Sequence, residues 1–198
     1  MFKRSLLSLC LAASTLTTPV TVVAQESKPT SIYNIKGNLP DLKFELQGLN
    51  RTVKAEDLQG KVALVFFGYA SCPDICPTTM AELGVLKKSL GEQQDKVKIV
   101  FISVDPHRDT PEILQAYVDA FDNDALGLTG SAEQIAEIAK RYRVAYQIEK
   151  PKPGADANNY EVMHAQGIYI FDEKGKARFL ASNAENTELL KEKLLQLW

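Results

Sequence analysis

Apolar residues follow two kinds of pattern along this chain, and together they predict a mixed α/β fold. Two nearly continuous apolar runs, residues 62–67 and 97–104, are typical of central strands that are covered on both faces. Residues 42–46 and 143–148 instead alternate between apolar and polar side chains, which predicts strands with one exposed face. Between these stretches, apolar residues recur every three or four positions, as they do in amphipathic helices.

Helices are expected after both central strands. Apolar residues recur at helical spacing up to about Gly91, and Pro77 suits the first position of that helix. Thr110 and Pro111 favour the start of a second helix, as N-cap and first helical residue. We expect the second helix to bury Ile113, Leu114, Tyr117 and Phe121.

The remaining elements complete one domain. A capping box at Ser131 and Gln134 predicts a third helix. The other expected elements are a return strand from Thr52, a helical turn at 55–60, a short strand at 125–128, a hairpin formed by 166–171 and 177–180, and a last helix at 187–198. This order predicts a thioredoxin-like α/β sandwich over residues 39–198, with an N-terminal hairpin and an insertion at 143–165. Within that insertion, prolines and a glycine at 150–159 indicate a mobile loop.

The first residues have the pattern of an export signal. Lys3 and Arg4 form a basic head, residues 6–16 form an apolar core, and small residues follow. We therefore expect residues 1–24 to be a signal peptide, with an uncleaved membrane anchor as the alternative. A polar, flexible leader would follow at 25–38. The protein would then be exported and periplasmic, or tethered to the inner membrane.

Composition narrows the classes of function. The 198 residues are enough for one well-buried core. The formal net charge of −2 gives no electrostatic basis for binding nucleic acid, and loss of Lys3 and Arg4 would make the protein more negative. A cationic protein partner suits this charge better.

Two cysteines carry the candidate chemistry. If Cys10 leaves with the signal, Cys72 and Cys76 remain. A disulfide between them would close so small a loop that it would constrain the unfolded chain little, which disfavours a purely structural bridge. Cys76 is expected just before a helix, where the helix dipole favours a thiolate. A redox pair and a soft-metal site for Cu(I) or Zn(II) both remain open.

The chain has two histidines, and they have different surroundings. His164 follows the mobile loop and precedes a buried strand, so we favour it as a third metal ligand. Met163 beside it could add a thioether, although we favour a packing role. His107 lies among charged loop residues and is expected at the solvated surface.

Asp105 and Asp109 lie where the second central strand ends. Because parallel neighbouring strands end at the same edge of a sheet, we expect their loop to approach the cysteines. A supporting or docking role is one interpretation. Ordinary turn formation and helix capping is the other.

Three features together resemble the Sco/SenC family across about residues 35–198. They are C-P-D-I-C-P at 72–77, D-P-H-R-D-T-P at 105–111 and the late histidine at 164. The resemblance implies a thioredoxin-like fold that binds one copper ion through Cys72, Cys76 and His164. Family members serve the assembly of the copper-A centre of cytochrome c oxidase, as copper donors, as thiol reductants of its cysteines, or both.

The resulting hypothesis is a copper metallochaperone that delivers copper to, or matures, the copper-A site. Its expected partner is subunit II of cytochrome c oxidase or another copper protein. Nucleic acid is not expected as a partner, and a membrane only if the N-terminus remains as an anchor. The alternative is a thiol–disulfide reductase that uses Cys72 and Cys76 on the cysteines of the copper-A site. A structural zinc site is disfavoured because a fourth good ligand is missing.

Overall fold

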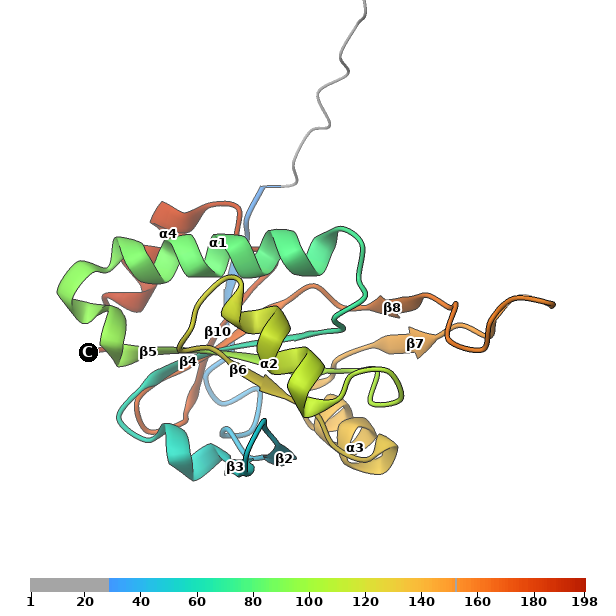
Figure 1. Ribbon diagram of the computed structural model, residues 1–198. Helices are drawn as coiled ribbons and strands as arrows, with labels where there is room; N and C mark the ends of the chain where they lie inside the picture. Colours follow the sequence, from blue (N-terminus) through green and yellow to red (C-terminus); the bar gives the residue numbers. More distant parts are fainter. Residues whose placement is uncertain (1–28, 152) are drawn as a thin grey trace, which may run out of the picture.

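The computed structural model describes residues 29–151 and 153–198 and contains a six-stranded central sheet in the order β1-β10-β9-β4-β5-β6 (Figure 1). Its strands are β1 (Ile32–Asn34), β4 (Val62–Gly68), β5 (Val97–Ser103), β6 (Leu126–Leu128), β9 (Ile168–Phe171) and β10 (Ala177–Ala181). Two separate hairpins join β2 (Glu45–Gln47) to β3 (Thr52–Lys54) and β7 (Tyr146–Ile148) to β8 (Val162–His164). The predicted signal segment 1–24 lies outside the described residues.

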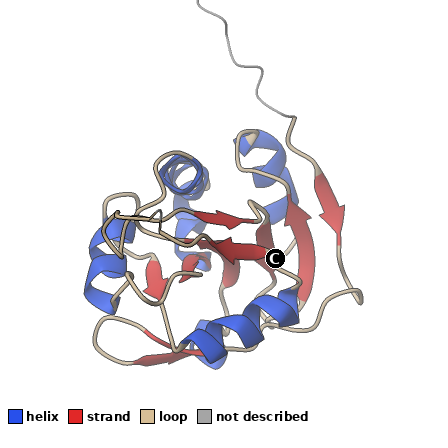
Figure 2. Ribbon diagram, turned by 90° about the vertical axis from the view of Figure 1, so that its right-hand side faces the viewer, coloured by secondary structure: helices blue, strands red, loops and turns tan. Residues whose placement is uncertain are grey.

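Helices cover both faces of the sheet (Figures 1 and 2). They are α1 (Ile75–Ser89), α2 (Pro111–Asp119), α3 (Ala132–Tyr142) and α4 (Thr187–Leu194), with short 3₁₀ turns η1 (Ala55–Leu58) and η2 (Gly91–Lys96). Helices α1 and α4 pack together on one face, while α3 and the β2–β3 hairpin lie on the other. This arrangement confirms the predicted thioredoxin-like sandwich, its early hairpin and its insertion.

Strand β4 is the centre of the fold because it is buried along its whole length. It pairs in parallel with β5 and antiparallel with β9. Successive side chains of a strand point to opposite faces. Phe66 accordingly packs near Phe101 on one side, whereas Phe67 packs near Tyr142 of α3 on the other. One short apolar run thus fills the core on both faces of the sheet.

The expected flexible leader contains a strand. Residues 32–34 pair antiparallel with β10 as β1, at the edge of the sheet, and the Ser31 N–H donates to Ser182 Oγ (2.9 Å). Within the described residues 29–38, the expected flexible leader therefore includes a paired strand, which its polar composition did not indicate. A three-residue strand has no hydrophobic period of its own, and here the backbone hydrogen bonds to β10 define it.

Helix starts were predicted more accurately than helix burial. Thr110 Oγ1 accepts from Ile113 N (3.3 Å), and Ser131 forms its capping box with Gln134. Leu114 is fully buried as predicted, but Ile113 is 47% exposed. The side of α2 that faces the sheet carries Leu114 and Val118, so Ile113 points away from the core.

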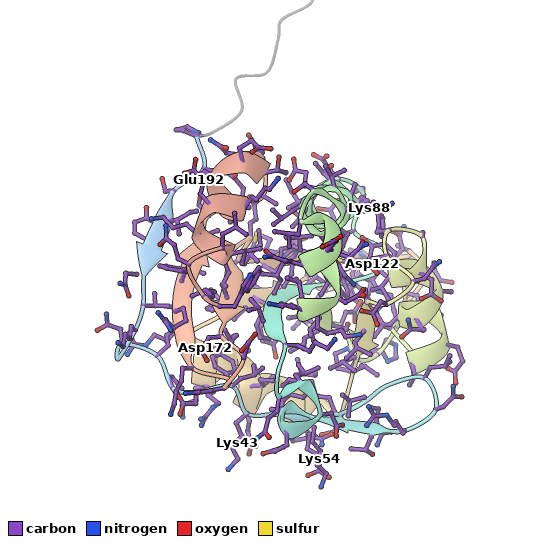
Figure 3. The ribbon with its side chains drawn as sticks, turned by 90° about the vertical axis from the view of Figure 1, so that its left-hand side faces the viewer. Lys43, Lys54, Lys88, Asp122, Asp172 and Glu192 are labelled. Atoms are coloured by element: carbon purple, nitrogen blue, oxygen red, sulfur yellow. The ribbon has the colours of Figure 1, made fainter. Side chains whose placement is uncertain are left out.

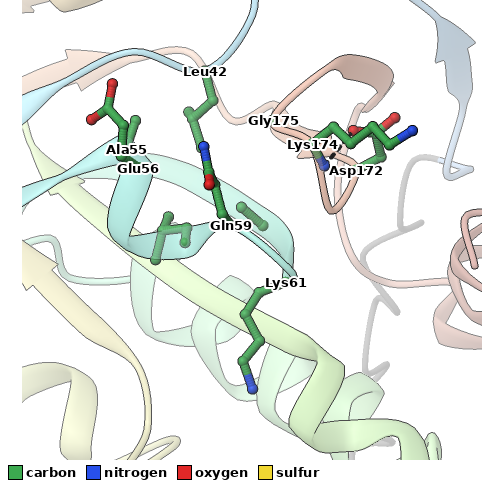
Figure 4. Close-up of a pocket in the computed structure, with 10 residues that line it drawn as sticks. Leu42, Ala55, Glu56, Gln59, Lys61, Asp172, Lys174 and Gly175 are labelled. Carbon is green, nitrogen blue, oxygen red and sulfur yellow. Dashed lines mark hydrogen bonds between the residues drawn. The ribbon is translucent and has the colours of Figure 1, made fainter.

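The end of the sheet where β4 begins is rich in charged side chains, including Lys88, Asp172 and Glu192 (Figure 3). A small cavity of about 80 Å³ lies there, between η1 and the β9–β10 turn (Figure 4). Asp172 closes that turn because its Oδ1 accepts hydrogen bonds from the backbone N–H groups of Lys174 (3.0 Å) and Lys176 (2.9 Å). The candidate site is at the opposite end, where β4 stops.

Candidate metal centre

Strand β4 and helix α1 place the two cysteines. Cys72 lies in the loop after Gly68, and Cys76 lies in the first turn of α1. A Cβ atom on Gly68 would be 2.7 Å from Cys76 Sγ and 2.9 Å from Cε2 of Phe101. Glycine therefore leaves the space in which the sulfur rests against the end of the strand.

Helix α1 begins two residues earlier than predicted. Its first residue is Ile75 rather than Pro77, with Asp74 as N-cap. Proline is tolerated in this turn because the first N–H groups of a helix have no acceptor within it. Cys76 is consequently inside the helix and fully buried, not just before it.

His164 reaches the cysteines because β9 runs antiparallel to β4. Ile168, the first residue of β9, pairs with Phe66 near the end of β4, so the chain enters β9 beside the cysteine loop. His164 Nε2 lies 3.2 Å from Cys76 Sγ. Its Nδ1 lies 3.1 Å from the carbonyl oxygen of Ala165, which can only accept, so Nδ1 carries the proton. The lone pair of Nε2 then faces the sulfur.

The structure brings all three predicted site residues together. The Sγ atoms of Cys72 and Cys76 and a ring nitrogen of His164 lie within 4.8 Å of one another. Both cysteines are free thiols, with Cys72 half-buried and Cys76 buried. The rings of Phe66 and Tyr69 meet the imidazole edge-on, each at a centroid distance of 5.9 Å. The cluster therefore has an aromatic wall, and Cys72 is its solvent-facing side.

The donor set selects for soft metal ions. Two thiolates and an imidazole suit Cu(I) and Zn(II). Structural zinc sites need four ligands, and the cluster found among residues 29–151 and 153–198 offers three from histidine, cysteine and carboxylate side chains. The residues present thus fit a three-coordinate copper ion better than structural zinc.

The two thiols differ in acidity. The hydrogen bond from Cys76 lowers the pKa of Cys72 to about 3 against the opposing effect of burial, and the backbone N–H of Asp74 contributes. The same hydrogen bond, together with burial, raises the pKa of Cys76. Of the two cysteines, Cys72 is therefore the one that more readily forms a thiolate.

The loop after β5 contacts the cysteine loop, as expected from the sequence. Asp109 is buried, and its Oδ2 accepts from the Ala70 N–H (3.0 Å) and from Ser103 Oγ (2.6 Å). Burial raises the pKa of Asp109, and the two hydrogen bonds act against that rise. Asp109 thus ties the backbone just before Cys72 to the end of β5, which favours a supporting role over simple turn formation.

The other two predicted side chains lie at the surface. His107 is exposed, as expected. Met163 is 54% exposed, so its predicted packing role was wrong. Neighbouring side chains of β8 alternate between faces, and Met163 points away from the side that His164 occupies.

Sequence reasoning missed Tyr69 and Arg108. The Arg108 guanidinium lies 5.5 Å from the Tyr69 ring centroid. Both residues line a cleft of about 520 Å³ beside Cys72, together with Ser71, Pro73 and residues of 156–161. Only the motif at 105–111 pointed to Arg108, and no local pattern indicated its contacts.

Comparison with known proteins places the chain in a family. The sequence pattern of the SCO1/SenC family matches residues 37–198. The SCO2-like protein RP587 of Rickettsia prowazekii is 34% identical over 134 residues, which span 67% of this chain and 64% of that protein. The chain therefore matches slightly less than two thirds of this relative's length.

Solved structures agree with that match. Bradyrhizobium japonicum ScoI with copper bound has a TM-score of 0.69 and 34% identity, covering 80% of this chain and 99% of that one. BsSco, described as a Sco-family cytochrome c oxidase assembly protein with a disulfide switch, has a TM-score of 0.56 and 25% identity, covering 80% and 96%. No helix among the described residues is long and apolar enough to cross a membrane. On the evidence of sequence and fold, the chain belongs to the SCO1/SenC family.

Proposed function

We propose that the protein binds one copper ion through Cys72, Cys76 and His164 and acts as a metallochaperone in cytochrome c oxidase assembly. The observation that carries the proposal is the convergence of two free thiols and an imidazole within 4.8 Å at one end of the sheet. Copper bound to a ScoI relative, and the assembly role stated for BsSco, support it. The proposed client is the copper-A site of subunit II or another copper protein.

Each residue has a distinct part in this proposal. The buried Cys76 would anchor the ion, because Gly68 and the first turn of α1 fix its sulfur. His164 would present Nε2, held in orientation by the hydrogen bond from Nδ1 to Ala165. Cys72 is half-buried and would be the ligand that an incoming client reaches first. In this proposal the copper ion is cargo that passes to a client site, and it takes part in no other reaction on this protein.

A copper titration tests the proposal. Reduced protein is titrated with Cu(I) against a competing chelator, and with Cu(II) while thiolate absorbance is followed. We expect one equivalent to bind, with loss of the absorbance band in Cys72→Ala. His164→Ala should weaken binding at least as much as the roughly 10- to 100-fold loss seen when a group supporting a metal ligand is removed. His107→Ala, the exposed histidine, is the matched control and should bind as the wild type does.

Two results would count against copper binding by these residues. One is the absence of tight binding to the reduced wild-type protein. The other is unchanged binding by His164→Ala, which would remove His164 from the ligand set.

A second candidate is thiol–disulfide reduction of client cysteines, favoured by the half-buried Cys72 beside the buried Cys76. The Cys72 thiolate would attack a client disulfide, forming a mixed disulfide and releasing one client thiolate. Cys76 would then attack Cys72 Sγ, forming the Cys72–Cys76 disulfide and releasing the second client thiolate, which takes up the Cys76 proton. Two electrons pass to the client. Weak copper binding together with a readily cycled disulfide would favour this candidate over the first.

We also propose that residues 1–24 are an export signal and that the protein is periplasmic. The support is the basic head and apolar core of that segment. Mass spectrometry of the protein isolated from cells should find an N-terminus at Gln25, whereas an intact N-terminus in the membrane fraction would indicate an anchor.

A further inference from the structure

The side chain of Arg108 connects two parts of the chain that are far apart in sequence. Its Nη1 donates to the backbone carbonyl oxygens of Asn158 (3.0 Å) and Tyr160 (2.8 Å). Its guanidinium also stacks on the Tyr160 ring, at 3.8 Å from the centroid. Arg108 therefore holds the backbone and the side chain of the stretch 156–161 at once.

Arg108 is itself held by a residue of the loop that follows β5. Its Nε forms an ion pair with Oδ2 of Asp105, a fully buried carboxylate. The other oxygen, Oδ1, accepts from the Tyr160 hydroxyl (2.8 Å). Asp105, Arg108 and Tyr160 thus form a closed set of contacts in which one buried carboxylate orients both partners. A planar guanidinium can donate to a carboxylate and to backbone carbonyls while it stacks on an aromatic ring, which a lysine ammonium cannot do.

The stretch held by Arg108 leads directly to the histidine ligand. Tyr160 lies four residues before His164, which is the last residue of β8. The residues from 153 to 159 are exposed, so their contacts with the rest of the domain are few. Arg108 also lies 5.5 Å from the ring of Tyr69, which meets the His164 imidazole edge-on. Arg108 therefore contacts two neighbours of His164, the segment that leads to it and the Tyr69 ring.

We propose that Arg108 is a positioning residue that holds His164 at the cysteines and so sets how fast the site releases its metal. This inference rests on the proposed copper binding. Asp105 orients the Arg108 guanidinium, and Tyr160 transmits its position to β8. When these contacts are broken, His164 leaves Cys76 more often, and a chelator or a client reaches the ion from the cleft beside Cys72.

Arg108→Lys is the principal variant, because lysine keeps the charge beside Asp105 but cannot contact two carbonyls and stack on Tyr160. In the metal-free protein, amide hydrogen exchange at 156–165 should rise about tenfold, the effect expected from losing one hydrogen bond to a charged group. Removal of Cu(I) by a chelator should accelerate by a similar factor, about tenfold. Arg141→Lys is the matched control: Arg141 also donates to a backbone carbonyl and lies near a tyrosine ring, but on α3.

A second, smaller substitution keeps the inference testable if Arg108→Lys does not fold. Tyr160→Phe keeps the ring under Arg108 and removes only the hydroxyl that donates to Asp105. It should give a smaller increase in both rates, about two- to fivefold. Exchange and release rates of Arg108→Lys that both match the wild type and Arg141→Lys would overturn the inference.

The exchange measurement separates this inference from the proposed function. If the wild type binds no copper, the proposed function fails, and exchange in the metal-free protein still shows whether Arg108 holds the segment before His164. If copper binds with Cys72, Cys76 and His164 but its release is indifferent to Arg108, only the inference fails.

Discussion

Gly68 determines whether the buried sulfur fits against the end of β4. No positive φ requires glycine at this position, and the constraint is space alone. The nearest neighbours of a Cβ atom would be Cys76 Sγ and the ring of Phe101, neither of which is a freely moving chain end. The residue thus couples packing of the core to the position of a candidate ligand.

Gly68→Ala should displace the Cys76 sulfur and weaken copper binding. We expect the free energy of unfolding to fall by about 1 to 3 kcal/mol, the usual effect of overpacking. Gly84→Ala is the control, since its Cβ would be as crowded, 2.8 Å from the Phe121 carbonyl oxygen, but away from the site. Chelator competition and urea unfolding should show a stability loss in both variants and an affinity loss in Gly68→Ala alone. Equal copper affinity in the two would contradict this account.

At the scale of elements, the antiparallel edge formed by β1 and β10 has consequences for stability. Strand β1 supplies backbone hydrogen bonds to β10, and the buried Ile35 follows it. It is also three strands away from β4 in the sheet order, so it does not touch the candidate site.

A chain that begins at Gly37 should therefore be less stable than one that begins at Pro29. The expected loss in free energy of unfolding is about 1 to 3 kcal/mol, from a few net hydrogen bonds and the exposed apolar edge. Urea unfolding measures it, and copper affinity should stay unchanged. Equal stability of the two chains would mean that residues 29–36 behave as a leader after all.

The sequence predicted those elements whose signal is local. Val62 to Phe67 had to be a central strand because every residue is apolar, and Thr110 and Ser131 marked helix starts through their own side chains. The three site residues were proposed from their chemistry and from the resemblance of the motifs around them to a known family. Strand β1 and the contacts of Arg108 were missed because their partners are 145 or more and about 50 residues away. Pro77 misled because the first turn of a helix accepts proline at several positions.

At the scale of the whole molecule, the two ends of the sheet have different tasks. One end holds the candidate metal site, formed by Cys72, Cys76 and His164, and the cleft beside it. The other is closed by polar contacts, among them the turn at Asp172 with its ion pair to Arg178 (2.9 Å). Although burial opposes it, hydrogen bonds from the Lys176 N–H and from Arg178 lower the pKa of Asp172.

Asp172 should therefore contribute to the pH dependence of stability but not to copper binding. A lowered pKa means that the unfolded chain takes up the proton first as the pH falls, so the contribution is present above about pH 4 and lost below it. Asp172→Asn should lower the free energy of unfolding at neutral pH by about 1 to 3 kcal/mol, and the difference should shrink toward about pH 3. Asp41→Asn, at an exposed ion pair, should change stability by less than about 1 kcal/mol. A difference that grows on acidification would refute the assigned sign.

The antiparallel course of β9 also determines the order in which the candidate ligands come together as the protein is made. Cys76 and His164 are 88 residues apart, and the histidine arrives only when the last hairpin joins the sheet. During synthesis, a nascent chain that ends before residue 164 contains only the two cysteines of the candidate site. The complete ligand set therefore forms only once synthesis has passed His164, and an ion held by all three ligands would connect the early β4–α1 unit to a part of the chain that is made much later.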